Sequence, residues 1–227
     1  MRSALVTGGS SGIGLAIARL LGEEGYALSI AARTPEKLQA AASGLGATPI
    51  VADVSDAGDC TRVVEEHLAR HGGLDVLVNS AGVGVGGGID EQSVKQIDLQ
   101  TSVNLRGLIL VTRAALPALR SSRGLIVNLA SITGVIPAAS LPIYAATKAA
   151  VISLTGSLNQ ALETDGVRVH ALCPAYVDTP MASHAGLSSE EMIQPEDCAE
   201  VVRLLLRLSP KARIPQVVIE RVGARSA

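Results

Sequence analysis

Short apolar segments alternate with segments whose apolar residues recur at helical spacing along nearly the whole chain. Residues 76–78 and 125–127 are apolar at every position, which is typical of parallel strands that helices cover on both faces. The pattern predicts strands at residues 4–7, 27–31, 49–51, 76–79, 125–129, 167–172 and 216–219. It predicts helices at residues 12–24, 35–42, 57–71, 94–120, 143–164 and 195–208.

The strand–helix alternation continues without a repeat, a linker or a change of composition from residue 1 to residue 227. This favours a single-domain Rossmann-type fold, a doubly wound parallel sheet of about seven strands with helices on both faces. The two long loops, 82–88 and 174–194, both come directly after strands. We therefore expect both at the carboxyl edge of the sheet, where ligands bind in such folds, with a short lid over the ligand around residues 178–194.

Composition narrows the classes of function. The chain has a formal net charge of -2, three tyrosines and neither tryptophan nor phenylalanine. It therefore lacks the basic surface and the aromatic platforms that nucleic acid or an anionic membrane would require. Cys60, Cys173 and Cys198 are widely spaced and form no Cys/His cluster, so we expect neither disulfide nor metal. With no secretion signal or membrane-spanning pattern, we expect a cytoplasmic protein.

Two glycine-rich segments lead into different kinds of sequence. Residues 7–14 read T-G-G-S-S-G-I-G, come after the first predicted strand and lead into an apolar helical pattern. Glycines there would let the backbone approach a pyrophosphate at the start of a helix, although an ordinary strand-to-helix turn is the alternative. Residues 82–87 formally fit G-x-G-x-x-G, but they lead into Ile89-Asp90-Glu91-Gln92. We interpret that second segment as a flexible loop and not as a phosphate site.

Tyr144 and Lys148 stand four residues apart in a predicted helix, on the same face. A nearby ammonium favours the phenolate form of tyrosine and would lower its pKa, which would suit proton exchange in an alcohol–ketone interconversion. Ser131 comes directly after a predicted strand, and Asn104 interrupts an apolar helical pattern. Chance spacing, a turn serine and a solvent-facing asparagine are the alternatives for these residues.

The motifs together resemble those of the short-chain dehydrogenase/reductase family over nearly the whole chain. The loop at residue 7 has that family's T-G-x-x-x-G-x-G spacing, and residues 79–82 read N-S-A-G where the family has N-N-A-G. Residues 174–179 resemble P-G-x-V-x-T, with Ala175 in place of glycine. The resemblance implies cofactor contacts at Gly8, Ser10, Ser11, Gly12, Ile13, Gly14, Arg33, Asp53, Val54, Asn79, Ala81, Gly82, Tyr144, Lys148, Pro174, Val177 and Thr179.

The resemblance also implies a catalytic tetrad and a reaction. Tyr144 would exchange a proton with the substrate oxygen, and Lys148 would assist it and hold the nicotinamide ribose. Ser131 would orient the carbonyl, and Asn104 would support a proton relay. The expected reaction is hydride transfer between NADP(H) and a carbonyl or secondary alcohol.

The end of the second predicted strand favours NADP(H) over NAD(H). An NAD enzyme of this architecture usually places an acid there, to bind both ribose hydroxyls. Here the chain has neutral Ala32 and then Arg33, whose guanidinium suits a phosphate. Ser10 could add a hydroxyl contact to the same phosphate. A solvated Arg33 that merely begins a turn is the alternative.

Two other functions are compatible with the same fold. A non-catalytic NADP(H)-sensing regulatory protein is the first alternative, and a nucleotide-sugar epimerase or dehydratase is the second. The substrate is expected to be a small carbonyl or alcohol, near a lid in which His184 could touch it. Residues 103–111 are apolar on more than one helical face, so we expect a homodimer or homotetramer.

Overall fold

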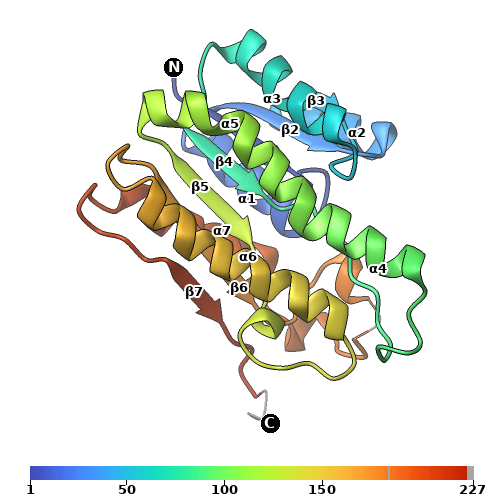
Figure 1. Cartoon of the computed structure of the whole chain (residues 1–227). Coiled ribbons are helices and arrows are strands. Elements are labelled where there is room, and N and C mark those ends of the chain that lie inside the picture. The colour runs from blue at the N-terminus through green and yellow to red at the C-terminus, as the bar shows by residue number, and fades with distance from the viewer. Residues whose placement is uncertain (184, 224–227) are drawn as a thin grey trace.

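A parallel seven-stranded sheet with the order β3-β2-β1-β4-β5-β6-β7 forms the centre of the computed structural model, which describes residues 1–183 and 185–223 (Figure 1). The strands are β1 (Ser3–Thr7), β2 (Ala27–Ala32), β3 (Thr48–Val51), β4 (Val76–Asn79), β5 (Leu125–Leu129), β6 (Arg168–Pro174) and β7 (Gln216–Ile219). The strand order reverses at β1, which pairs with both β2 and β4. This reversal is the topological switch point, next to which ligands bind in doubly wound sheets.

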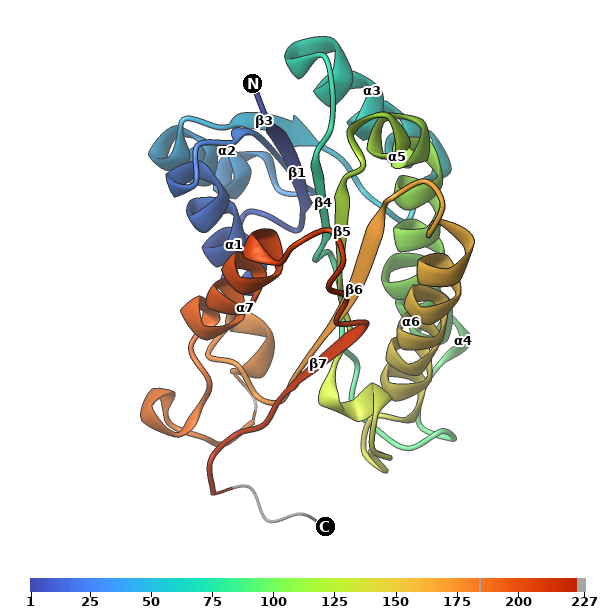
Figure 2. The same cartoon turned by 90° about the vertical axis from the view of Figure 1, so that its left-hand side faces the viewer.

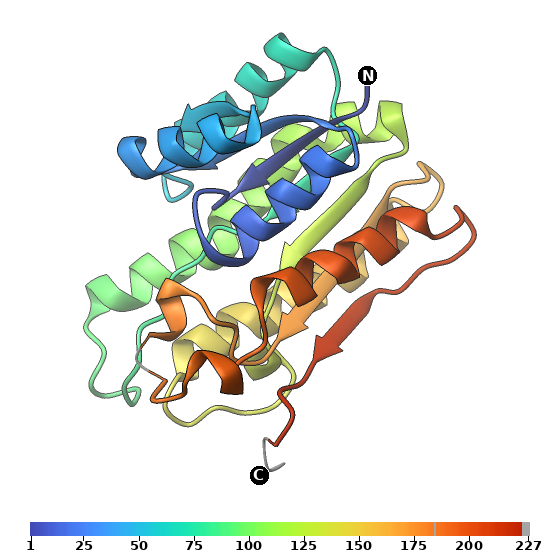
Figure 3. The same cartoon turned by 180° about the vertical axis from the view of Figure 1, so that it is seen from behind.

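Helices cover both faces of the sheet (Figure 2). One face carries α1 (Gly12–Glu23), α2 (Pro35–Leu45) and α7 (Pro195–Arg207), and Figure 3 shows α1 and α7 side by side on it. The opposite face carries α3 (Ala57–His71), α5 (Leu108–Ser122) and α6 (Pro142–Ala161), with α4 (Val94–Thr101) extending beyond the sheet. The doubly wound parallel fold expected from the sequence is confirmed.

The apolar side chains of the central strands belong to two hydrophobic cores, one on each face of the sheet. Val6, Val78 and Val127 pack on the side of α1 and α7. Their chain neighbours Leu5, Leu77 and Ile126 pack on the side of α3 and α5. Successive side chains of a strand point to opposite faces, so a strand that is apolar throughout must be covered twice. No helix among the described residues combines the length and apolar character needed to cross a membrane.

The helix predicted at residues 94–120 is wrong in one respect, because it is not a continuous α-helix. A π-helical turn over Ser102–Gly107 separates α4 from α5. Such wide turns are rare and are frequently found at functional sites. Gly107 lies against the Val54 carbonyl, which a Cβ at that position would strike. The turn contains Asn104, so the polar residue that interrupts the apolar pattern stands where the helix widens.

Candidate active site

A cleft of about 730 Å³ opens at the carboxyl edge of the sheet, between the loops that come after β1, β2, β3, β4, β5 and β6. Most of the residues that the sequence singled out line this cleft. They are Gly8, Ser10, Ser11, Gly12, Ile13, Gly14, Arg33, Asp53, Val54, Ala81, Gly82, Ser131, Tyr144, Lys148, Pro174, Val177 and Thr179. Asn79 and Asn104 lie behind the wall of the cleft instead. His184 lies outside the described residues.

The glycine loop after β1 is held tightly against its neighbours. Gly8 has a φ of 68°, and its N–H donates to the Ala31 carbonyl over 2.8 Å. A Cβ on Gly8 would approach the Ala81 nitrogen to 2.8 Å, and one on Gly14 would strike the Gly8 carbonyl oxygen. Both positions therefore require glycine, for reasons of space and, at Gly8, of backbone conformation as well.

The start of α1 presents free backbone donors at the cleft. Ser11 is the N-cap residue, but its side chain makes no capping hydrogen bond. The first helical bond there runs from the Leu15 N–H to the Ser11 carbonyl over 3.2 Å. The N–H groups of residues 12–14 have no acceptor among the described residues. Unpaired N–H groups at a helix start carry partial positive charge and favour a phosphate.

Tyr144, Lys148 and Ser131 converge at the far end of the cleft. Tyr144 and Lys148 are one turn apart in α6, and the Lys148 Nζ lies 5.5 Å from the centroid of the Tyr144 ring. Only 4% of Lys148 is exposed, and its Nζ donates to the Leu129 carbonyl over 2.6 Å. Ser131 lies just past the end of β5 and accepts hydrogen bonds from the Thr133 backbone N–H and hydroxyl. The spacing in the sequence thus brings these three groups together.

Burial dominates the electrostatics of the pair. It raises the pKa of the Tyr144 phenol, an effect that the polar Ser131 side chain partly offsets. Burial also lowers the pKa of Lys148 to about 8. The expectation that Lys148 lowers the phenol's pKa is therefore not met in the protein alone. The phenol keeps its proton at neutral pH, as a proton donor must.

Asn104 lies in the π turn, immediately behind the loop after β4. Its Oδ1 accepts from the Val83 N–H over 2.8 Å, and its Nδ2 donates to the Val83 carbonyl over 2.8 Å. The same Nδ2 donates to the Thr147 hydroxyl over 3.2 Å. A Cβ on Gly82 would stand 3.5 Å from the Asn104 Oδ1 and 3.7 Å from the Lys148 Nζ. Asn104 is therefore near the catalytic candidates, but its side chain binds protein groups.

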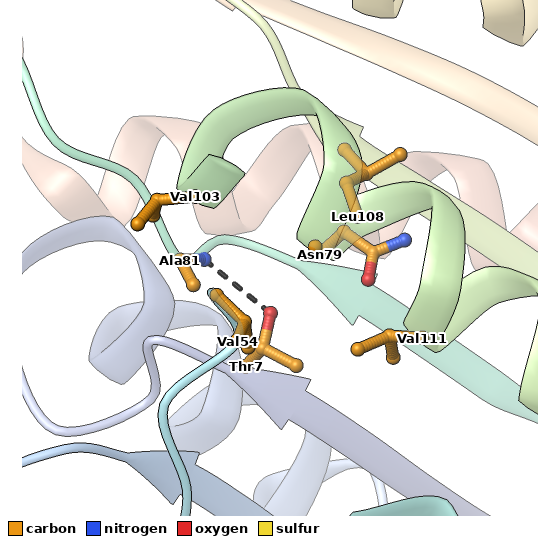
Figure 4. Close-up of a pocket in the computed structure, with 8 residues that line it drawn as sticks. Thr7, Val54, Asn79, Ala81, Val103, Leu108 and Val111 are labelled. Carbon is orange, nitrogen blue, oxygen red and sulfur yellow. Dashed lines mark hydrogen bonds between the residues drawn. The ribbon is translucent and has the colours of Figure 1, made fainter. Parts of the chain in front are cut away.

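Asn79 is buried inside the sheet and does not reach the cleft. Its Nδ2 donates to Thr112 on α5 and to Asn128 on β5. Its Oδ1 has no hydrogen-bond partner within the described part of the chain. Figure 4 shows Asn79 beside Thr7, whose hydroxyl accepts from the Ala81 N–H, around a gap with no room for water. This geometry gives Asn79 a packing role between strands.

The cleft also contains a cation that the sequence pattern did not single out. Lys37, the third residue of α2, lines the same end of the cleft as Arg33. Both side chains are exposed, and neither forms an ion pair within the described residues. The signal was a lysine four positions beyond Arg33, which sequence alone does not distinguish from a solvated surface residue.

Comparison with known proteins agrees with the geometry of the cleft. Residues 2–189 match the family described as short chain dehydrogenase. An uncharacterized oxidoreductase of Staphylococcus aureus is 35% identical over 223 residues, which cover 96% of each chain.

Two solved structures superpose on almost the whole chain. One is the alcohol dehydrogenase from the archaeon Thermococcus sibiricus complexed with 5-hydroxy-NADP, with a TM-score of 0.93, 32% identity and coverage of 100% of this chain and 99% of the other. The other is the 3-ketoacyl-(acyl-carrier-protein) reductase from Brucella melitensis complexed with NADH, with a TM-score of 0.90, 28% identity and coverage of 100% and 98%. With its family model, its relatives and its cleft in agreement, the chain is an oxidoreductase that belongs to the short-chain dehydrogenase/reductase family.

Proposed function

We propose that this protein interconverts a small carbonyl compound and the corresponding secondary alcohol with NADP(H) as the redox cofactor. The observation that carries the proposal is the position of Tyr144, Ser131 and Lys148 in the cleft that begins at the glycine loop. A cofactor laid along this cleft from the glycine loop would bring its nicotinamide to these three side chains.

The residues of the cleft fit a dinucleotide. Gly8 and Gly14 have no side chains, so the ligand can approach the backbone of the loop closely. The free N–H groups at the start of α1 suit the pyrophosphate. Asp53 and Val54 would contact the adenine, and Pro174, Val177 and Thr179 would line the nicotinamide side. When bound, the cofactor supplies the hydride that the carbonyl carbon gains.

The protein's own contribution is to hold and move the proton. In the reduction, Tyr144 donates its phenolic proton to the carbonyl oxygen, and the raised pKa keeps that proton in place beforehand. Ser131 orients the oxygen beside the phenol. The buried Lys148 ammonium supports the phenolate that forms and would bind the nicotinamide ribose. Asn104 holds the backbone at Val83 next to this group.

The preference for NADP(H) depends on the opposite end of the cleft. Arg33 and Lys37 place two cations there, and Ala32 occupies the position where an acid would bind the ribose of NAD(H). Among the solved structures, the Thermococcus sibiricus enzyme holds an NADP derivative, a metagenomic short-chain oxidoreductase holds NADP and the Brucella melitensis reductase holds NADH, so both cofactors occur among the structural neighbours.

The test is cofactor oxidation over a panel of neutral ketones and 3-oxoacyl thioesters, with NADPH and NADH side by side. We expect turnover with NADPH on at least one carbonyl class. Tight NADPH binding with no turnover of any probe would contradict the proposal and favour a cofactor sensor.

We also propose that the protein is a homodimer or homotetramer. Val103, Leu108 and Val111 are buried in the chain, but Leu99 is 37% exposed and Ile109 is 39% exposed along the same helical region. A covering helix of a second copy would bury these side chains. Light scattering at micromolar concentration should give at least twice the chain's mass, and a monomeric mass would contradict the proposal.

A further inference from the structure

The glycine-rich loop after β4 is held by side chains along one edge of its backbone. Asn104 binds both backbone groups of Val83. Gln100 accepts from the Val85 N–H over 3.3 Å, and Gln92 donates to the Val85 carbonyl over 3.4 Å and to the Gly87 carbonyl over 3.2 Å. Every second residue of the loop, from 83 to 87, is therefore bound by a carboxamide.

The two glutamines form a buried pair outside the cleft. Gln100 is fully buried and Gln92 is 8% exposed, and neither lines the cleft. Gln100 donates to the Gln92 Oε1 over 2.7 Å and to the Gln96 carbonyl over 3.2 Å. Burying a polar side chain is unfavourable unless it is hydrogen-bonded, so such a pair is expected only where its bonds are used. Here those bonds fix the loop.

The intervening residues face the candidate active site. Gly84 and Gly86 are exposed and line the cleft. Their N–H and C=O groups have no hydrogen-bond partner among the described residues. A Cβ on Gly84 would lie 3.7 Å from the Tyr144 ring and 4.0 Å from the Met181 Sδ, so Gly84 is immediately beside the candidate proton donor.

We propose that Gln92 and Gln100 are specificity-determining positioning residues, which hold the loop so that the peptide groups of Gly84 and Gly86 bind an uncharged polar group next to the reacting carbonyl. A hydroxyl fits best, because it can accept from an N–H and donate to a C=O at the same time. The substrate class is thus a ketone with a hydroxyl on the adjacent carbon. This inference rests on the proposed function of the same cleft.

Two isosteric ketones test the proposal. The probes are 3-hydroxybutan-2-one and 3-methylbutan-2-one, which differ by a hydroxyl in place of a methyl group, and kcat/KM is measured for each with NADPH. Comparing this ratio between variants cancels the intrinsic reactivity of the ketones. Gln100→Met keeps the side-chain length but removes the bonds that hold Val85, and we expect the hydroxyl-to-methyl ratio to fall about threefold to tenfold, the worth of one neutral hydrogen bond.

Gln160→Met is the matched control. Gln160 is an exposed residue near the end of α6 and does not line the cleft, so the ratio should equal that of the unaltered protein. An unchanged ratio in a folded Gln100→Met variant would overturn the proposal, because a merely structural role would change both ketones alike.

A second readout depends neither on turnover nor on a change in the loop or its glutamines. In the Tyr144→Phe variant saturated with NADP⁺, which should not oxidise the probe's own hydroxyl, the backbone amide resonances of Gly84 and Gly86 should shift on addition of 3-hydroxybutan-2-one, and much less with 3-methylbutan-2-one. Equal shifts with both ketones, or none, would overturn the inference. If neither ketone is reduced but the amides respond selectively, the inference stands and the proposed function fails for these ketones.

Discussion

The two glycine-rich loops lie on the same cleft but use glycine for different reasons. In the loop after β1, a side chain on Gly8 or Gly14 would strike backbone atoms, so glycine is a steric requirement. In the loop after β4, a Cβ on Gly84 or Gly86 would meet its nearest atoms at 3.7 and 3.8 Å, which is ordinary contact. Glycine is therefore optional for folding at these two positions, and at Gly84 its effect is to leave room beside Tyr144.

The loops also differ in what holds them. The first is fixed by backbone bonds to β2 and by packing against Ala81. The second, although predicted to be flexible, is bound by the carboxamides of Asn104, Gln100 and Gln92. The first loop tolerates no side chain at Gly8 or Gly14 because of these clashes, whereas the second loop can be repositioned by substitutions of the glutamines outside the cleft. Under the proposed function, the first loop would hold the cofactor and the second would contact the substrate.

The largest expected effect comes from Tyr144, the residue beside Gly84 of the second loop. Tyr144→Phe removes the exchangeable proton and little volume, so kcat should fall by about 10²–10⁴-fold while cofactor affinity and the melting temperature remain close to those of the unaltered protein. Steady-state kinetics, NADPH fluorescence titration and thermal unfolding check this. More than a tenth of the original kcat would contradict the role of Tyr144.

Alanine substitutions in the two loops test the comparison directly. Gly8→Ala should lower the free energy of unfolding by about 2–4 kcal/mol, because it combines a left-handed φ with overpacking against Ala81. Gly86→Ala should cost less than about 1 kcal/mol, since it has neither problem. Urea denaturation measures both variants. Equal losses would show that the two loops are not different in kind.

A smaller effect is expected at the positively charged end of the cleft, where Arg33 lies. Arg33→Ala would remove the proposed charged contact to the 2′-phosphate of NADPH, and kcat/KM should fall by the equivalent of about 1.5–3 kcal/mol with NADPH and little with NADH. Arg70→Ala, at an exposed position of α3 away from the cleft, is the control. A protein that already prefers NADH, or equal losses with both cofactors, would make the assignment wrong.

Much of the fold could be predicted because its signals are local. β7 begins and ends at the predicted residues, and the fully apolar runs located β4 and β5. The glycine pattern of residues 7–14 and the spacing of Tyr144 and Lys148 were likewise local signals. Residues from both segments line the same cleft. Each of these features depends on neighbours within a few positions of the chain.

What escaped prediction depends on distant parts of the chain. The π turn at Ser102–Gly107 lies within a segment of helical spacing that Asn104 interrupts, and one polar residue does not reveal a wider turn. The turn is accompanied by close packing of Gly107 on Val54, about fifty positions earlier in the chain. In the sequence, Gln92 is only a polar residue after a loop, and nothing indicates that it binds the carbonyls of Val85 and Gly87. The raised pKa of Tyr144 could not be inferred either, because it results from burial that only the folded chain produces.

The π turn also determines the angle about the helix axis by which the side chains of α4 are rotated relative to those of α5. It contains more residues than an α-helical turn, and each residue of an α-helix advances it by about 100°. Deleting one residue from 102–107 would make the helix regular, but α4 would then be rotated by about that angle relative to α5. If Val111 and Leu119 stayed against the sheet, Gln100 would turn away from Val85. The length of this segment should therefore be invariant in related chains that keep the glutamine pair, even where its sequence changes.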